Sequence, residues 1–323
     1  MKRAELAQRI AALIDARADG SVDDEARDAL LADLGVYQAA TVEPYGQLCL
    51  GLRSPGSGLL PAMPTDVFRH ARMAGHPAEL DIRVFRTSGT TQTHRGAHPF
   101  RTLELYDRAA EAAARRMLFP DRARMRLVIL AAEPSAAPDS SLSYMLGRFV
   151  EWFGDESTWV LRGDELALDE LARTLDRAVK EEAPIALLGT SFAFVHALDG
   201  LGDKRWTLPR DSRIMQTGGF KGRSRTVEPR EMRGLLEERF GVPDALIVAE
   251  YGMTEMSSQL YETTLRDALL GEGDGQRKLW VPGWVRALPV DPETLRVVPP
   301  GEVGILRIDD AANLDSVAAL QTA

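Results

Sequence analysis

The chain has 323 residues, of which 45% are apolar and 27% charged, and its formal net charge is −9. These values are typical of a folded globular protein of one or two domains, and the negative charge argues against a general nucleic-acid-binding protein. No apolar run approaches about 18 residues, and the N-terminal stretch carries charges throughout. We therefore expect no membrane span, no secretory signal and a cytoplasmic location. The single cysteine, Cys49, excludes an internal disulfide and a multi-cysteine zinc site.

Residues 1–80 are predicted to form a helical lead segment. Apolar residues recur there at helical spacing in two sets, Leu6, Ile10, Leu13 and Ile14, and then Ala26, Leu30, Leu31 and Leu34. Such spacing places one apolar face on each helix. Residues 53–64 are rich in Gly and Pro and predict a loop.

Residues 81–270 are predicted to form an α/β core. Short apolar runs each lead into a loop of small residues, and the runs lie at 82–85, 127–131, 185–188, 214–215 and 246–249. Helices are expected at 103–117, 165–179 and 229–240. This alternation favours a largely parallel sheet, and ligands bind beyond the carboxyl ends of the strands in such sheets. The five loops are therefore expected to converge on one site.

Residues 271–323 have a different character. The segments 280–285, 295–298 and 303–308 are rich in β-branched and apolar residues and are bounded by Pro and Gly. They predict a small β-rich subdomain packed on the α/β core.

The loop after the first apolar run contains the residues best suited to bind phosphate. Its sequence is Thr87-Ser88-Gly89-Thr90-Thr91, and Arg95 follows shortly after. Gly89 lets successive backbone N–H groups turn into one concavity, the hydroxyls add donors, and Arg95 adds positive charge. The spacing is not that of a Walker A loop. The alternative is an ordinary polar turn after a strand.

The second candidate site follows the run at 246–249. Tyr251 offers a flat face for a base, Thr254 a hydroxyl for a phosphate, and Glu255 an oxygen ligand for Mg²⁺. The alternative is a strand-to-loop turn with a buried tyrosine and a solvated glutamate.

Together these motifs resemble the acyl-adenylate-forming superfamily, which includes acyl-CoA synthetases and nonribosomal adenylation domains. The shared order is Thr-Ser-Gly-Thr-Thr, then a Thr-Gly-Gly turn, then Tyr-Gly-Met-Thr-Glu. Within the superfamily the chain is most similar to the acyl-protein synthetase (LuxE-like) branch, on the evidence of residues 60–68, 140–145, 189–192 and 217–222. The resemblance covers roughly residues 55–323 and implies that all three parts belong to one large adenylation domain.

The resemblance implies that the core binds ATP, Mg²⁺ and a carboxylic acid, and forms acyl-AMP with release of pyrophosphate. It assigns the β- and γ-phosphates to Thr87, Ser88, Gly89, Thr90 and Thr91, and the adenine and acyl pocket to Gly218, Gly219, Phe220, Tyr251 and Gly252. It also implies that Thr254, Glu255 and Arg95 are catalytic, with Thr254 at the α-phosphate and Glu255 on the metal. A fatty or other apolar acid is expected, with CoA or an acyl acceptor protein as partner.

Three departures from the family pattern limit what the resemblance implies. Gln92 and Arg95 stand where the family has a Gly and a Lys. The C-terminal lid and its Lys are expected to be absent, which predicts a truncated chain of low activity. In LuxE-like proteins a C-terminal Cys accepts the acyl group, whereas this sequence offers only Cys49. Cys49 lies in an apolar run and is expected to be unreactive. Two alternatives stay open: an aryl-acid CoA ligase resembling phenylacetate-CoA ligase, and a non-catalytic nucleotide-binding partner subunit.

Overall fold

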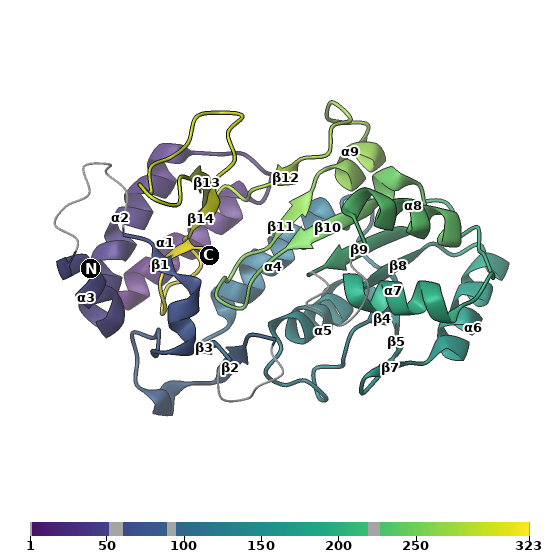
Figure 1. Cartoon of the computed structure of the whole chain (residues 1–323), viewed down its shortest axis with the longest axis horizontal. Helices are drawn as coiled ribbons and strands as arrows, with labels where there is room; N and C mark the ends of the chain where they lie inside the picture. The colour runs from purple at the N-terminus through teal and green to yellow at the C-terminus, as the bar shows by residue number, and fades with distance from the viewer. Residues whose placement is uncertain (1, 52–60, 89–94, 219–226, 323) are drawn as a thin grey trace.

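The computed structural model describes residues 2–51, 61–88, 95–218 and 227–322. The N-terminal helices and the last strands lie together at one end of the molecule, and a large sheet with its helices forms the other end (Figure 1). None of the helices within these ranges is long and apolar enough to cross a membrane.

The predicted helical lead segment is confirmed for the part of it that the structure describes. Its helices are α1 (Arg3–Arg17), α2 (Asp24–Thr41) and α3 (Glu43–Gly51), followed by two 3₁₀ turns, η1 (Thr65–Arg69) and η2 (Ala78–Leu80). Asp23 caps α2, since its side chain accepts a hydrogen bond from the amide of Ala26 at 3.0 Å. The apolar residues that the spacing predicts on α1 and α2 are buried, except Ala26, which is exposed in the first turn of α2.

The α/β core is confirmed and contains a seven-stranded sheet of order β12-β11-β10-β9-β8-β4-β5. Its strands are β4 (Met125–Leu130), β5 (Gly154–Trp159), β8 (Ile185–Thr190), β9 (Arg213–Thr217), β10 (Ile247–Tyr251), β11 (Leu260–Glu262) and β12 (Leu279–Trp280). The neighbouring strands β5, β4, β8, β9 and β10 pair in parallel. At the other end of the sheet, β11 and β12 add antiparallel pairs.

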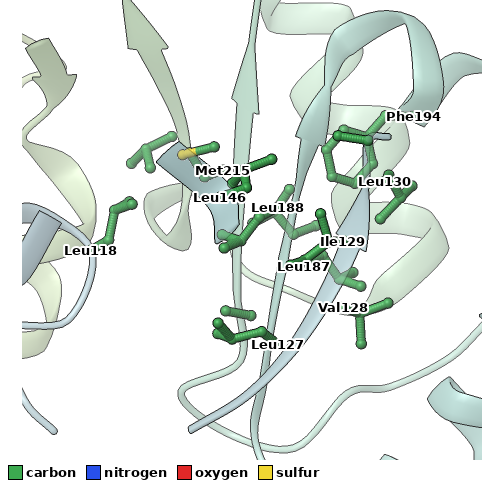
Figure 2. Close-up of a cluster of buried hydrophobic side chains, with 14 of the residues drawn as sticks. Leu118, Leu127, Val128, Ile129, Leu130, Leu146, Leu187, Leu188, Phe194 and Met215 are labelled. Carbon is green, nitrogen blue, oxygen red and sulfur yellow. The ribbon is translucent and has the colours of Figure 1, made fainter. Parts of the chain in front are cut away.

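Helices cover both faces of this sheet, with α4 and α5 on one face and α7 and α8 on the other (Figure 1). The helices of this part are α4 (Glu104–Met117), α5 (Ser141–Phe153), α6 (Leu168–Lys180), α7 (Ser191–Gly200), α8 (Pro229–Phe240) and α9 (Thr264–Leu270). The central strands carry mostly apolar residues because both of their faces are buried. Figure 2 shows the resulting core, in which side chains of β4 and β8 pack with Leu118, Leu146 and Phe194.

A second sheet of four strands has the order β1-β15-β14-β13. Its strands are β1 (Met63–Pro64), β13 (Val285–Val290), β14 (Ile305–Asp310) and β15 (Ala319–Gln321). The buried apolar residues of this sheet form one cluster with those of α1 and α2. Arg3, near the N-terminus, donates a hydrogen bond to Asp315, near the C-terminus, at 2.6 Å.

Several local expectations were wrong. Trp280 lies in β12 and pairs with β11 of the large sheet, not with the small one. The segment 295–298 contributes only a bridge between Val297 and Val290. Met63, in the expected loop, forms β1 because it pairs with Leu320, a partner that no local pattern reveals. The domain boundaries at residues 80 and 270 stay a prediction.

Two small hairpins account for the other differences. The run at 82–85 does form a strand, but β2 (Arg83–Arg86) pairs only with β3 (Ala97–Phe100) and lies outside the large sheet. Similarly, β6 (Leu161–Arg162) pairs with β7 (Glu165–Leu166). This second pairing uses the first residues of the helix expected at 165–179, so α6 begins only at Leu168.

Candidate functional site

The carboxyl ends of β8, β9 and β10 lie side by side, as the sequence predicted for their loops. The register pairs Thr190 with Thr217, and Thr217 with Glu250. Thr190 also caps α7, because its hydroxyl accepts from the amide of Ala193 at 3.1 Å. The start of α7 and the turns after β9 and β10 therefore lie together at the carboxyl ends of the central strands.

The loop predicted to bind phosphate is closed at its base by Thr87 and Gly96. The amide of Thr87 donates to the carbonyl of Gly96 at 2.9 Å, and the amide of Gly96 donates to the hydroxyl of Thr87 at 2.8 Å. Thr87 is half-buried and Ser88 is exposed. Gly89, Thr90 and Thr91 lie outside the described residues, so phosphate binding by this loop stays a prediction.

Arg95 braces this hairpin against the loop that follows β4. Its Nε donates to the carbonyl of Thr87 at 2.5 Å, and its Nη1 donates to the Asp139 carboxylate at 2.7 Å. Its Nη2 lies 3.3 Å from the carbonyl of Arg86. A catalytic role for Arg95 at the phosphates stays a prediction.

The two sequence motifs meet through His98. This residue lies on β3, and its Nδ1 is 2.8 Å from the carbonyl oxygen of Thr254. Burial lowers the pKa of His98 to about 4, although the bond to Thr254 opposes the shift. The ring is therefore neutral near pH 7, and Nδ1 carries the proton because a carbonyl can only accept.

Glu255 lies against the base of the candidate phosphate loop, beside Gly96. A Cβ placed on Gly96 would be 3.4 Å from the Glu255 Oε1 and 3.1 Å from the Cγ2 of Thr87. Glu255 is only 7% exposed, so it is not the solvated glutamate of the alternative reading. Burial raises the pKa of Tyr251, and the Glu255 charge adds to the effect.

The Glu255 carboxylate beside the candidate phosphate loop fits Mg²⁺, the metal that the sequence predicted there. Mg²⁺ usually binds one or two carboxylates and completes its shell with water and substrate phosphates. Within the described ranges no three His, Cys, Asp or Glu side chains gather to hold a metal by themselves. A single carboxylate beside a candidate phosphate loop therefore matches a metal that arrives with a nucleotide.

The first residue of α7 forms a hydrogen bond to the turn after β9. Gly218 has a φ of 71°, which favours glycine, and its carbonyl accepts from the Ser191 hydroxyl at 2.9 Å. Ser191 also lies 3.2 Å from the amide oxygen of Gln216. Gly219 and Phe220 lie outside the described residues, so their place in an adenine and acyl pocket is still a prediction.

Sequence reasoning missed Glu250, which is 6% exposed on β10. The hydroxyl of Thr217 donates to its Oε2, and a Cβ on Gly252 would lie only 2.6 Å from its Oε1. Gly252 therefore leaves room for this carboxyl. Burial raises the pKa of Glu250 to about 7, partly offset by the hydrogen bond from Thr217. The sequence did contain one signal for this residue, a single acidic residue near the end of an otherwise apolar strand.

Glu250→Gln is expected to stabilise the protein at pH 8 but not at pH 4.5. The pKa of Glu250 is higher in the folded state than its ordinary 4.5, so its contribution to stability is lost as the pH rises from about 4.5 to about 7. The gain at pH 8 should be on the order of 2–3 kcal/mol, measured by urea unfolding. Glu302→Gln, at an exposed position, is the control. Equal effects of Glu250→Gln at both pH values would contradict the assignment.

Sequence reasoning also missed Asp310, the last residue of β14, and Asn313, which follows the strand. Asp310 accepts from the amide of Ser257 at 2.9 Å and from the hydroxyl of Ser258 at 2.7 Å. The side-chain amide of Asn313 donates to the carbonyl of Glu255 at 2.7 Å. Burial raises the pKa of Asp310, although these hydrogen bonds oppose the shift. Both residues are buried and fix the backbone that carries Glu255.

Cys49 lies near the end of α3 and is half-buried. Burial raises the pKa of its thiol, although contact with Tyr45 opposes the shift, and this direction was expected from its apolar run. A thiol with a raised pKa is a poor nucleophile at neutral pH.

Solved structures of known proteins share features of this fold. The structure of 2-hydroxyisobutyryl-CoA ligase in the postadenylation state with 2-HIB-AMP matches with a TM-score of 0.64 at 15% identity, and the match covers 92% of this chain and 62% of that one. The same ligase with 2-HIB-AMP and CoA in the thioesterification state gives 0.65 at 15% identity, with the same coverage. ATP-bound MatB from Rhodopseudomonas palustris gives 0.45 at 17% identity over 74% of this chain and 41% of its own. Comparison with curated protein sequences gives no match.

The chain has the fold of the acyl-adenylate-forming ligases, although it spans less than two thirds of the length of 2-hydroxyisobutyryl-CoA ligase. The profile of the LuxE acyl-protein synthetases matches residues 59–319. The chain therefore belongs to the LuxE acyl-protein synthetase family.

Proposed function

We propose that this protein activates a carboxylic acid with ATP and Mg²⁺, forming acyl-AMP and releasing pyrophosphate. The observation that carries the proposal is the contact between the two motifs. His98, from the hairpin of the candidate phosphate loop, donates to Thr254, and Glu255 lies beside Gly96 at the base of that loop. Membership of the LuxE family and the ligase fold support the same reaction.

Each site residue has a role in this proposal. Residues 87–91 bind the β- and γ-phosphates, Thr254 contacts the α-phosphate, and Glu255 holds the metal. Tyr251 and Gly252 border the adenine, while residues 218–220 line the adenine and acyl pocket. Arg95 supplies positive charge at the phosphates. The buried hydrogen bonds of His98 and Asn313 keep the segment after β10 in place.

In the proposed reaction a carboxylate oxygen attacks the α-phosphorus, and the bond to the departing pyrophosphate breaks. Bound Mg²⁺ would neutralise charge on the phosphate oxygens. The chain itself aligns the acid with the nucleotide and supplies fixed hydrogen-bond donors, so its contribution is positioning and preorganised electrostatics. No side chain needs to form a covalent intermediate in this half-reaction.

The acid in this proposal is fatty or otherwise apolar, and the acyl group then passes to a thiol or another acceptor, on an acyl acceptor protein or CoA. One observation favours the aryl-acid CoA ligase as a second candidate. Phe192, half-buried in the first turn of α7, packs its ring 4.3 Å from that of His196 and presents an aromatic surface near the sheet edge. An aromatic acid can stack on such a surface.

Pyrophosphate exchange into ATP across a panel of fatty, aryl and short hydroxy acids tests the proposed function. Exchange is expected with at least one acid, and it should fall on replacing both Ser88 and Thr90 by Ala, because the loop then loses two hydroxyl donors. Calorimetry with ATP and Mg²⁺ should show the same loss in nucleotide affinity. ATP binding without exchange for any acid would instead identify a non-catalytic nucleotide-binding subunit. Preference for aryl acids would select the second candidate.

A further inference from the structure

The N-terminal helices lie outside residues 59–319, the part of the chain that the LuxE profile matches. They nevertheless contact the segment between β14 and β15 closely. Gln38 of α2 is completely buried, with its side-chain amide directed at this segment. Its Nε2 donates to the carbonyl of Asn313 at 2.6 Å and lies 3.2 Å from the carbonyl of Leu314, while its Oε1 accepts from the amide of Ala318 at 2.9 Å.

Asn313 continues this contact toward the candidate site. Its Nδ2 donates to the carbonyl of Glu255 at 2.7 Å and to that of Val317 at 3.0 Å, and its Oδ1 accepts from the hydroxyl of Ser257. Asn313 is 2% exposed, so no water replaces these bonds if they are lost. One side chain thus separates the lead helices from the backbone of Glu255.

These bonds matter energetically because they are buried and satisfied at both ends. A buried amide that loses its partner costs more than the bond itself contributes, so the network holds one arrangement and resists intermediate ones. Asn313 holds the backbone carbonyl of Glu255, and Gln38 in turn holds the backbone carbonyl of Asn313. A shift of Gln38 is therefore expected to shift Glu255 as well.

We infer that Gln38 is a positioning residue for Glu255, acting through Asn313, so that the N-terminal helical segment sets the geometry of the metal-binding motif. The inference rests on the proposed function for the role of Glu255, but the structural coupling does not depend on it. The first readout is amide hydrogen exchange of residues 254–259 in the nucleotide-free protein. Gln38→Ala should speed exchange there at least several-fold, and Gln38→Met, which keeps the length of the side chain but removes both the donor and the acceptor, should act similarly.

The second readout is the Mg²⁺ dependence of ATP binding by calorimetry. Gln38→Ala should raise the half-saturating Mg²⁺ concentration about 3–10-fold, the range of a coupling of roughly 1 kcal/mol. Asn313→Ala should do the same, and the double variant should add little, because both substitutions cut one connection. Gln47→Ala, at an exposed position on α3, should change neither readout.

A destabilising control separates positioning from general loosening. Leu34→Ala removes a buried apolar side chain from the same helix and should lower stability without cutting the connection. If Leu34→Ala changes the exchange of residues 254–259 and the Mg²⁺ dependence as much as Gln38→Ala does, the inference is overturned. Additive effects of the Gln38 and Asn313 substitutions would overturn it too. Faster exchange in a protein that binds no ATP would instead contradict only the proposed function.

Discussion

Replacing Glu255 by Gln is expected to lower the rate of acyl-AMP formation by about 10²-fold or more. The substitution keeps the size of the side chain and removes its charge, and the loss of one preorganised electrostatic group from an active site typically has this magnitude. Glu255 is 7% exposed, so bulk water cannot replace its charge. Pyrophosphate exchange at saturating acid gives the measurement.

Added Mg²⁺ should restore part of this loss, because the substitution weakens metal binding and leaves the rest of the site in place. Glu272→Gln, at an exposed position, controls for a general change of charge and should leave exchange unchanged. Full activity of Glu255→Gln at ordinary Mg²⁺ concentrations would show that Glu255 takes no part in the reaction.

The largest expected effect on stability comes from Arg213→Met. Arg213 is 1% exposed, and its guanidinium pairs with both carboxylate oxygens of Asp121 at 2.8 and 2.9 Å. It also donates to the carbonyl of Leu118 at 2.7 Å. Methionine fills much of the same volume but leaves this carbonyl without its donor, and of its two arginine partners Asp121 keeps only Arg122. Arg213 is buried but Asp121 is partly exposed, so losing these charge-assisted hydrogen bonds should cost about 2–4 kcal/mol, measured by urea unfolding at pH 7.

The pH dependence of this effect is also predicted. Burial alone would raise the pKa of Asp121, but hydrogen bonds from Arg213 and Arg122 outweigh it and lower the pKa to about 2. Stability from the pair is therefore complete above the ordinary pKa of 3.8 and is lost as the pH falls toward 2. The difference between the wild type and Arg213→Met should shrink over this range. Arg210→Met, with a side chain that is 96% exposed, should change stability by less than about 0.5 kcal/mol at any pH.

The central strands of the large sheet could be predicted because each is buried on both faces and forms an apolar run, such as 185–188. The edge strands could not. β5 has the sequence Gly-Asp-Glu-Ser-Thr-Trp and shows no apolar pattern, since at the end of the sheet most of its side chains are exposed or half-buried. β1 is two residues long and exists only through its pairing with β15. Strands of this kind are determined by their partners more than by their own residues.

The candidate site divides in the same way. Thr254 and Glu255 could be predicted because their chemistry and their place after a strand are visible locally. The residues that hold them could not, because His98 contacts Thr254 across 156 residues and Asn313 contacts Glu255 across 58. Their side chains are ordinary polar groups in sequence, and only the tertiary structure shows that they are buried and paired.

The contact between α1, α2 and the last strands has a consequence for how the protein folds. Some of the residues that cover the apolar faces of α1 and α2, such as Leu314 and Leu320, come more than 270 residues later in the chain. Contacts so distant in sequence close late and slowly. Packing of α1 on α2 and α4 can cover part of these faces earlier, but the rest is expected to stay exposed until the last strands dock, which favours aggregation and proteolysis of chains stopped at that stage.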